Sequence, residues 1–259
     1  MGQIHRISSG PLANFVDSLW LAEGYAPAHA TERVLPTGRM GVVLDLRPDS
    51  AVAGLLSGAR TSAFILATAR PLSFLGVSFK AGGGYPFVGV PAGELQDLTE
   101  PLDTFWGSAA EALRTRVLEA KSTAARFDVV ERFLLTRLRG SVPRNCAVEF
   151  ALAQFQDASR VVSVGDMVAR TGMSARRFIA EFQHQVGLAP KTFCRVTRFG
   201  QVIGRIAQST EVNWTETALS CGYYDQAHFI HDFRAFSGMS PSAYLQYRTA
   251  SPNHVRIAR

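Results

Sequence analysis

The chain carries one pattern twice: residues 171–193 read TGMSARRFIAEFQHQVGLAPKTF, and residues 221–244 read CGYYDQAHFIHDFRAFSGMSPSAY. The glycines near the start of the copies, Gly172 and Gly222, lie 50 residues apart, whereas the later positions align at 51, so the second copy has one extra residue in its turn. Two copies indicate a duplicated unit, because a solenoid needs three or more repeats. The aligned pairs are Ser174 with Asp225, Phe178 with Phe229, Ile179 with Ile230, Phe182 with Phe233, Gly187 with Gly238, Pro190 with Pro241 and Phe193 with Tyr244.

The matched positions predict a short helix, a tight turn and a second, capped helix in each copy. The first glycine of each copy is suited to the left-handed conformation that ends a helix, and Ser174 or Asp225 is an N-cap residue that starts the next one. The two phenylalanines of each copy are four residues apart, so they turn one face of that helix to a core. A glycine and then a proline end the unit. Such helix pairs are typical of the helix-turn-helix motif, whose second helix enters the major groove of DNA.

Once the phenylalanines point inward, the remaining side chains of each second helix face outward. Arginine forms paired hydrogen bonds with guanine, glutamine does so with adenine, and alanine or isoleucine contacts the thymine methyl group. An ordinary helical bundle with a polar outer face is the alternative, and the duplication of a capped pair in a basic half of the chain disfavours it. The outward and edge positions are Ala175, Arg176, Arg177, Ile179, Ala180 and Gln183 in the first copy and Gln226, Ala227, His228, Ile230 and His231 in the second.

The length fits one large domain or two ordinary ones, and the charge indicates nucleic-acid binding only mildly, because many basic surfaces are merely solvated. The chain has 259 residues and a net charge of +6, of which +5 falls in residues 141–259. Most of its basic residues are arginine, which suits phosphates and guanine edges. No apolar run approaches the ~20 residues that span a bilayer, and the N-terminus lacks the apolar stretch of a signal peptide. We therefore expect a cytoplasmic protein that is not in a membrane.

The fold class expected is α+β, in two domains. Residues 1–140 are predicted to form a small β-barrel or sheet with helices, β-rich over 30–90 and helical over 91–140. Strands are predicted at 40–46, 51–56, 63–67 and 72–79. Residues 140–143 contain the glycine and proline of a domain boundary. An all-α domain with two helix-turn-helix motifs follows over 147–250, and a frayed tail over 251–259.

Residues 147–250 resemble the DNA-binding domain of the AraC/XylS family of bacterial transcription regulators, with matching motifs at 172–174, 178–182, 186–190, 218–234 and 238–244. The resemblance implies two helix-turn-helix units joined by a linker helix over 191–208, with both recognition helices in adjacent major-groove segments. It places base-reading roles on Arg176, Ile179 and Ala180 in the first unit and on Gln226, Ala227, His228 and His231 in the second. Contacts to DNA phosphates are expected from Arg195 and Arg198.

Two positions depart from the family pattern. Ala180 stands where such proteins often have a long polar or basic side chain, which weakens base reading there. Val168 stands where the second copy has the small Ala218, so the helices of the first unit are expected to approach less closely.

The segments 35–44, 76–83 and 87–95 resemble, more weakly, the sensor domains that precede this DNA-binding module. That resemblance implies ligand sensing or dimerisation. The partner expected is double-stranded DNA. Further candidate partners are a small-molecule effector, RNA polymerase and a second copy of the chain. Aromatic residues are core residues by default, but those that could line a ligand cavity are Trp20, Tyr25, Phe64 and Phe74.

An enzyme is one competing class. An enzyme would need a nucleophile with a base, and a metal barrel would need clustered ligands. Before residue 141 there are only His5 and His29, so we expect no catalytic site, no metal and no cofactor. Asp45 lies within an apolar strand and is either a polar group of a pocket or, as we favour, a residue facing solvent or a strand end.

Two further classes of DNA-binding protein are compatible with the sequence. A ligand-independent, nucleoid-type protein would need no pocket. A thiol sensor would use one of three scattered cysteines, which argue against a disulfide framework and a zinc site. Cys146 lies beside Arg144, which could favour a thiolate, while Cys194 and Cys221 have apolar neighbours and are expected in the core.

Overall fold

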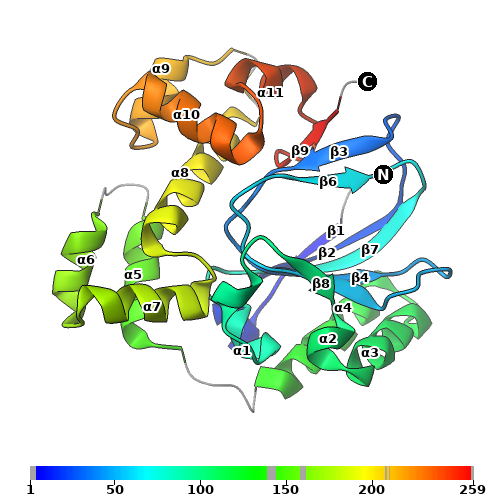
Figure 1. The fold of residues 1–259 in the computed structure, drawn as a ribbon. Helices are drawn as coiled ribbons and strands as arrows, with labels where there is room; N and C mark the ends of the chain where they lie inside the picture. The colour runs from blue at the N-terminus through cyan, green and yellow to red at the C-terminus, as the bar shows by residue number, and fades with distance from the viewer. Residues whose placement is uncertain (1–3, 139–143, 158–161, 208, 210, 258–259) are drawn as a thin grey trace.

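The computed structural model describes residues 4–138, 144–157, 162–207, 209 and 211–257 (Figure 1). The N-terminal part is a β-sheet domain with helices, and the C-terminal part is helical apart from a last strand that returns to the N-terminal strands. The predicted α+β class is therefore confirmed. The domain boundary predicted at 140–143 lies outside the described residues.

Within the described residues, the strands form two antiparallel sheets. The larger has the order β1-β2-β7-β4-β5-β8 and the smaller β6-β3-β9. The larger sheet is open, because no pairing in the described part joins its end strands β1 and β8. The strands are β1 (Ile4–Ile7), β2 (Val16–Tyr25), β3 (Thr31–Val34), β4 (Gly41–Asp45), β5 (Gly54–Ser57), β6 (Phe64–Ala67), β7 (Leu72–Phe79), β8 (Thr99–Pro101) and β9 (His254–Arg256).

The β-rich region is wider than the predicted 30–90. The four predicted strands are present as β4, β5, β6 and β7, but β1, β2 and β8 lie outside that range. In β2 the pairing register shifts between Val16 and Ser18 and again between Ala22 and Tyr25. These irregularities break the period-2 alternation by which a strand is recognised in a sequence.

One face of the larger sheet packs on the N-terminal helices. Leu19 and Val77 are register partners on adjacent strands, and both belong to the buried core that includes Trp106, Leu113 and Phe127 of the helices. The helices of this part are η1 (Gly10–Asn14), α1 (Tyr85–Val88), η2 (Ala92–Leu95), α2 (Asp103–Trp106), α3 (Ser108–Glu119) and α4 (Thr123–Leu138). The helical region predicted at 91–140 corresponds to η2, α2, α3 and α4.

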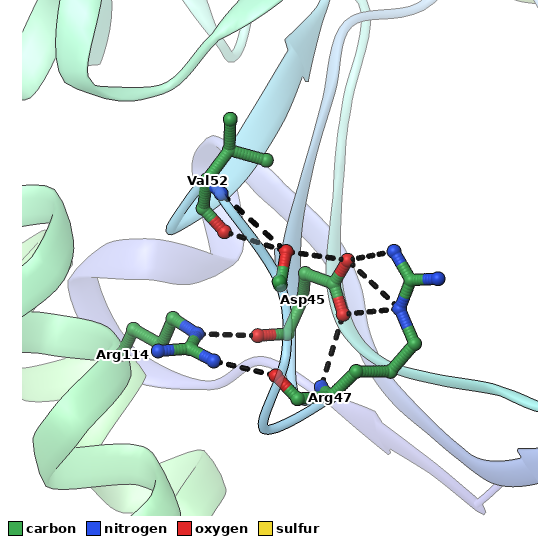
Figure 2. A network of polar contacts seen from close by, with 5 residues as sticks. Asp45, Arg47, Val52 and Arg114 are labelled. Atoms are coloured by element: carbon green, nitrogen blue, oxygen red, sulfur yellow. Dashed lines mark hydrogen bonds and ion pairs between the residues drawn. The ribbon is translucent and has the colours of Figure 1, made fainter.

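Asp45 is the last residue of β4, and neighbouring residues hold it by hydrogen bonds (Figure 2). Its carboxylate accepts from the Arg47 guanidinium at 2.5 Å and from the Ser50 hydroxyl at 2.9 Å. Arg114 of α3 donates to the backbone carbonyls of Asp45 and Arg47 at 2.7 and 2.6 Å. The expectation was a residue facing solvent or a strand end; Asp45 lies at the strand end, and its side chain is buried. It is buried because these contacts fix the turn after β4 against α3.

The C-terminal helices pack around a second core built on the phenylalanines of the repeat. Figure 1 shows α5, α6 and α7 at one end of α8 and α9, α10 and α11 at the other. The helices are α5 (Cys146–Gln156), α6 (Val164–Thr171), α7 (Ala175–Val186), α8 (Pro190–Ile206), α9 (Trp214–Ser220), α10 (Gln226–Ser237) and α11 (Pro241–Tyr247).

The tail is not frayed over the residues described. β9 pairs with β3 of the N-terminal domain, with Val255 opposite Arg33, and Val255 is completely buried. The expectation of a frayed tail over 251–259 is wrong here, because a short polar segment gains backbone hydrogen bonds from a strand more than 200 residues earlier. Arg256 lies in this strand and donates to the Gln246 carbonyl.

Candidate nucleic-acid interface

The first motif consists of α6, a turn and α7. Gly172 ends α6 in the left-handed conformation at φ 67°, and the Ser174 hydroxyl accepts from the Arg177 N–H to start α7. Phe178 and Phe182 of α7 are both completely buried. The helix ends at Gly187, again left-handed at φ 93°. The caps and the inward face are those that the sequence predicts, and they set the orientation of α7.

The second motif repeats this construction with α9 and α10. The Asp225 carboxylate accepts from the His228 N–H at 2.7 Å, and Phe229 and Phe233 are completely buried. Here the helix cap is Cys221, and the left-handed glycine, Gly222, follows one residue later. The extra residue of this turn follows the glycine: Tyr223 and Tyr224 separate Gly222 from Asp225, whereas Met173 alone separates Gly172 from Ser174.

A linker helix, α8, joins the two motifs. It spans Pro190–Ile206, close to the predicted 191–208, of which residue 208 lies outside the described part. Its 17 residues give a rigid connection roughly 25 Å long at 1.5 Å per residue. Val168, where looser packing was expected, is partly buried against the same core in which Ala218 is fully buried.

Most of the predicted base-reading side chains are accessible. Ile179 is 40 % exposed. His228 is half-buried, and its ring lies 5.2 Å from the ring of Tyr223. The exposed candidates are Arg176, Arg177, Ile179 and Ala180 on α7 and Gln226, Ala227 and His231 on α10.

Gln183 does not lie on the open face. It is half-buried, and its Cγ would lie 3.1 Å from a Cβ placed on Gly93 of η2. The next residue, His184, is hydrogen-bonded through Nε2 to the Tyr85 hydroxyl at 2.9 Å. The free outward position predicted for Gln183 is therefore corrected: the N-terminal domain covers this end of α7, a contact that helical periodicity does not reveal.

The two arginines predicted to contact phosphate pack on the second motif. Arg195 of α8 binds Asp232 of α10, with Nη2 2.6 Å and Nε 3.2 Å from Oδ1. Asp232 is 1 % exposed, and its hydrogen bond to Arg195 raises the pKa of that guanidinium. The guanidinium of Arg198 lies 5.0 Å from the ring centroid of Tyr223. This arrangement engages Arg195 in joining α8 to α10.

One exposed residue of the second motif has no counterpart in the prediction. Tyr224, in the turn before α10, is 88 % exposed. The signal that could have identified it is the extra residue of this turn, which displaces one side chain out of the motif's packed face.

The cysteines differ in their surroundings. Burial raises the pKa of the Cys194 thiol to about 11 and also raises that of Cys221, so neither is a ready thiolate. Cys146 is exposed. Its neighbour Arg144 pairs instead with Glu149 at 2.6 Å, and its guanidinium lies 4.6 Å from the ring centroid of Phe15.

The four aromatic residues predicted as candidates for lining a ligand cavity have different surroundings. The Tyr25 hydroxyl donates to Glu32, and the Arg60 guanidinium lies 4.9 Å from the ring centroid of Phe64. Trp20 and Phe74, on adjacent strands, are half-buried and stand opposite Gly76 and Ala22.

A hollow of about 360 Å³, not predicted from the sequence, lies beside the turn after β4. None of the four aromatic candidates lines it. Both turns that form it contain an Arg-Pro pair, which is the signal that the sequence offers. Its lining residues are Leu46, Arg47, Pro48, Asp49, Arg70, Pro71 and Ser73.

Comparison with known families finds two matches. A family described as "Helix-turn-helix domain" matches residues 167–247, and one described as "Domain of unknown function (DUF6597)" matches residues 6–101. No curated protein matches the chain.

Several solved structures are similar to parts of the chain or to most of it. The DNA-binding domain of AdpA, solved with a target DNA, is 25% identical over 39% of this chain and 92% of that one, with a TM-score of 0.36. A probable AraC family transcriptional regulator from Rhodopseudomonas palustris is 29% identical over 39% of this chain and 96% of its own, with a TM-score of 0.35. ToxT from Vibrio cholerae is 10% identical over 95% of this chain and 97% of its own, with a TM-score of 0.44.

The paired motifs define the class of the protein: it is a helix-turn-helix DNA-binding protein whose two motifs are fixed on one linker helix. The match over residues 167–247 agrees with the resemblance of these motifs to the AraC/XylS family of transcription regulators, and double-stranded DNA is the partner that helix-turn-helix motifs bind. No helix in the described part of the chain is long and apolar enough to cross a membrane.

Proposed function

We propose that α7 and α10 read two adjacent major-groove segments of one operator. The observation that carries this proposal is the accessibility of Arg176 on α7 and of Gln226 on α10, each in the first turn of a helix whose buried face is fixed by two phenylalanines. First-turn residues of a recognition helix are those that contact base edges. Ile179 adds an exposed apolar group suited to a thymine methyl.

The test is selection of binding sites from a random DNA pool, followed by affinity measurements at two salt concentrations. We expect a motif of two blocks about 10 bp apart, one helical turn of DNA. Arg176→Ala should relax the first block and Gln226→Ala the second, each at a cost of about 1–3 kcal/mol. Arg116→Ala removes an equally exposed arginine from α3 of the N-terminal domain and should leave both blocks unchanged. Binding without any motif would contradict the proposal and favour a nucleoid-type protein.

The N-terminal domain is proposed to be a regulatory domain in a cytoplasmic protein, without enzymatic activity of its own. The hollow between the two Arg-Pro turns supports a small effector with an anionic group for Arg70, since Arg47 is already paired with Asp45; Asp49, which also lines the hollow, favours a cationic group beside it. A thermal-shift screen of anionic metabolites tests this, with Arg70→Ala as the variant that should lose the shift. Binding to a second copy of the chain and binding to RNA polymerase remain predictions from the sequence.

A further inference from the structure

The N-terminal domain holds the C-terminal ends of both recognition helices. At α7, Gly187 lies against the fold's N-terminal part so closely that a Cβ there would be 3.1 Å from Ala59 and 3.2 Å from the carbonyl of Ala92 in η2. At α10, the contacts come from β3 and from Ala63, the residue before β6. The spacing between the two recognition helices thus has two supports: the linker helix α8 on one side and the N-terminal domain on the other.

The contact at α10 is a set of hydrogen bonds to carbonyls. Arg33 of β3 donates through Nη1 to the carbonyls of Ser237 and Gly238 at 3.2 and 3.1 Å. The N–H of Ala63 donates to the carbonyl of Phe236 at 3.1 Å. The last carbonyls of a helix have no partner within it and carry partial negative charge. A cation from the N-terminal domain therefore satisfies them and fixes the end of α10.

The same strand also holds the segment that follows α11. Besides the pairing of β3 with β9, the Leu35 N–H donates to the Asn253 carbonyl at 2.7 Å and the Ile257 N–H to the Thr31 carbonyl at 3.3 Å. Backbone hydrogen bonds thus join the end of the DNA-binding domain to β3. The two strands lie side by side in Figure 1.

A buried carboxylate strengthens this attachment. Glu32 is completely buried and accepts from His254 Nδ1 at 2.7 Å, from His29 Nε2 at 2.6 Å and from the Tyr25 hydroxyl. Burial tends to raise the pKa of Glu32, but these three hydrogen bonds outweigh it and hold that pKa at about 2. These three contacts make Glu32 the centre of a hydrogen-bond network. Since neighbouring residues of a strand point to opposite faces, Glu32 holds β9 while Arg33 holds α10.

We propose that β3 is the element through which the N-terminal domain sets the position of the second recognition helix, with Arg33 and Glu32 as positioning residues for DNA binding. This inference rests on the proposed function, in which α10 reads the second block of the operator. The regulation that follows is mechanical: a ligand that shifts β3 relative to η2 changes the separation of α7 and α10, and hence the operator spacing that the protein accepts.

The test compares two DNAs, the selected two-block site and the same site with one base pair inserted between the blocks. The readout is the Kd for the DNA with the inserted base pair divided by the Kd for the selected site. A variant that merely loses stability lowers the active fraction equally for both DNAs and leaves the ratio unchanged. Loss of hydrogen bonds to a charged donor loosens α10, so Arg33→Ala should shrink the ratio by up to about tenfold, and Glu32→Gln should shrink it in the same direction. Arg39→Ala, which removes an arginine of the N-terminal domain that is paired with Asp17, should leave the ratio as in the wild type.

A second measurement needs no variant. Hydrogen exchange of the peptides that cover 31–35 and 253–257 is followed with and without the selected DNA. DNA binding and the pairing of β3 with β9 are reciprocally linked if β3 positions α10, so DNA should slow exchange in both peptides. An unchanged Kd ratio in the folded variants, or unchanged exchange on DNA binding, overturns the inference while the two-block motif still stands. Failure of the wild type to select a motif overturns the proposed function itself, and the inference with it.

Discussion

Asp232 provides the sharpest test of how the second motif is held together. It lies on α10 and is 1 % exposed, and its Oδ1 accepts a hydrogen bond from Nη2 of Arg195 on α8 at 2.6 Å. His228 Nε2 lies 3.8 Å from its other oxygen. Replacing Asp232 by Asn keeps the shape and an acceptor but removes the charge that Arg195 faces. We therefore expect Asp232→Asn to destabilise the packing of α10 on α8.

The magnitude follows from the distance and the exposure. Unit charges at this separation attract by about 6 kcal/mol at an effective dielectric constant of 20, and desolvation offsets several kcal/mol of that. Breaking a buried pair typically costs about 3–5 kcal/mol, because one charge is left unpaired. The Arg195 side chain is 34 % exposed and can turn to water. We therefore expect Asp232→Asn to lower the free energy of unfolding by about 2 kcal/mol.

The assay must report on this motif alone, because a two-domain chain need not unfold in one step. Trp214 lies in the second motif, and its ring is stacked on Phe229 at 5.8 Å. Labelling with 5-fluorotryptophan and following the ¹⁹F resonance of Trp214 through a urea titration gives the local free energy by linear extrapolation. Trp214→Phe assigns that resonance.

The control is Asp17→Asn, which breaks the exposed pair of Asp17 with Arg39 at 3.3 Å. An exposed pair contributes less than about 1 kcal/mol. A loss below about 0.5 kcal/mol for Asp232→Asn, or an equal loss for both variants at this resonance, would refute the reasoning from burial. Combining Arg195→Met with Asp232→Leu should recover most of the loss, since the replacement pair leaves no charge unpaired.

Three further predictions concern single groups. The buried hydroxyl of Tyr223 has no hydrogen-bond partner among the described residues, so Tyr223→Phe should leave the urea midpoint unchanged or raise stability by up to about 1 kcal/mol; a clear loss would reveal a partner. A Cβ on Gly76 would lie 2.0 Å from the Trp20 indole, so Gly76→Ala should cost about 1–3 kcal/mol in thermal unfolding, and Trp20→Ala should relieve part of that cost. The pKa of Glu32 is depressed to about 2, so its ionised form contributes about 3 kcal/mol to the free energy of unfolding above about pH 4.5, and this contribution is lost as the pH falls towards 2. Glu32→Gln should therefore weaken the dependence of the free energy of unfolding on pH in this range. An unchanged dependence would contradict the assignment.

Much of the DNA-binding domain could be predicted because its signals are local. A cap such as Ser174 acts on a backbone N–H three residues away, and Phe178 with Phe182 defines a helix face by spacing alone. The N-terminal strands were harder to predict, because register shifts in β2 interrupt the alternation and because β1 and β8 are short. The turn at Asp45 illustrates the limit: its partner Arg114 lies 69 residues away.

The sequence by itself determined the duplicated motifs, their capped helices and the outward face that carries Arg176 and Gln226. These depend on interactions within one or two helical turns, which residue type and spacing specify. Only the tertiary structure decided that Gln183 is covered by η2, that Arg195 binds Asp232, and that β9 joins β3 beside Glu32. Such contacts join segments far apart in the chain, and their formation depends on the packing of the whole molecule, which no local pattern encodes.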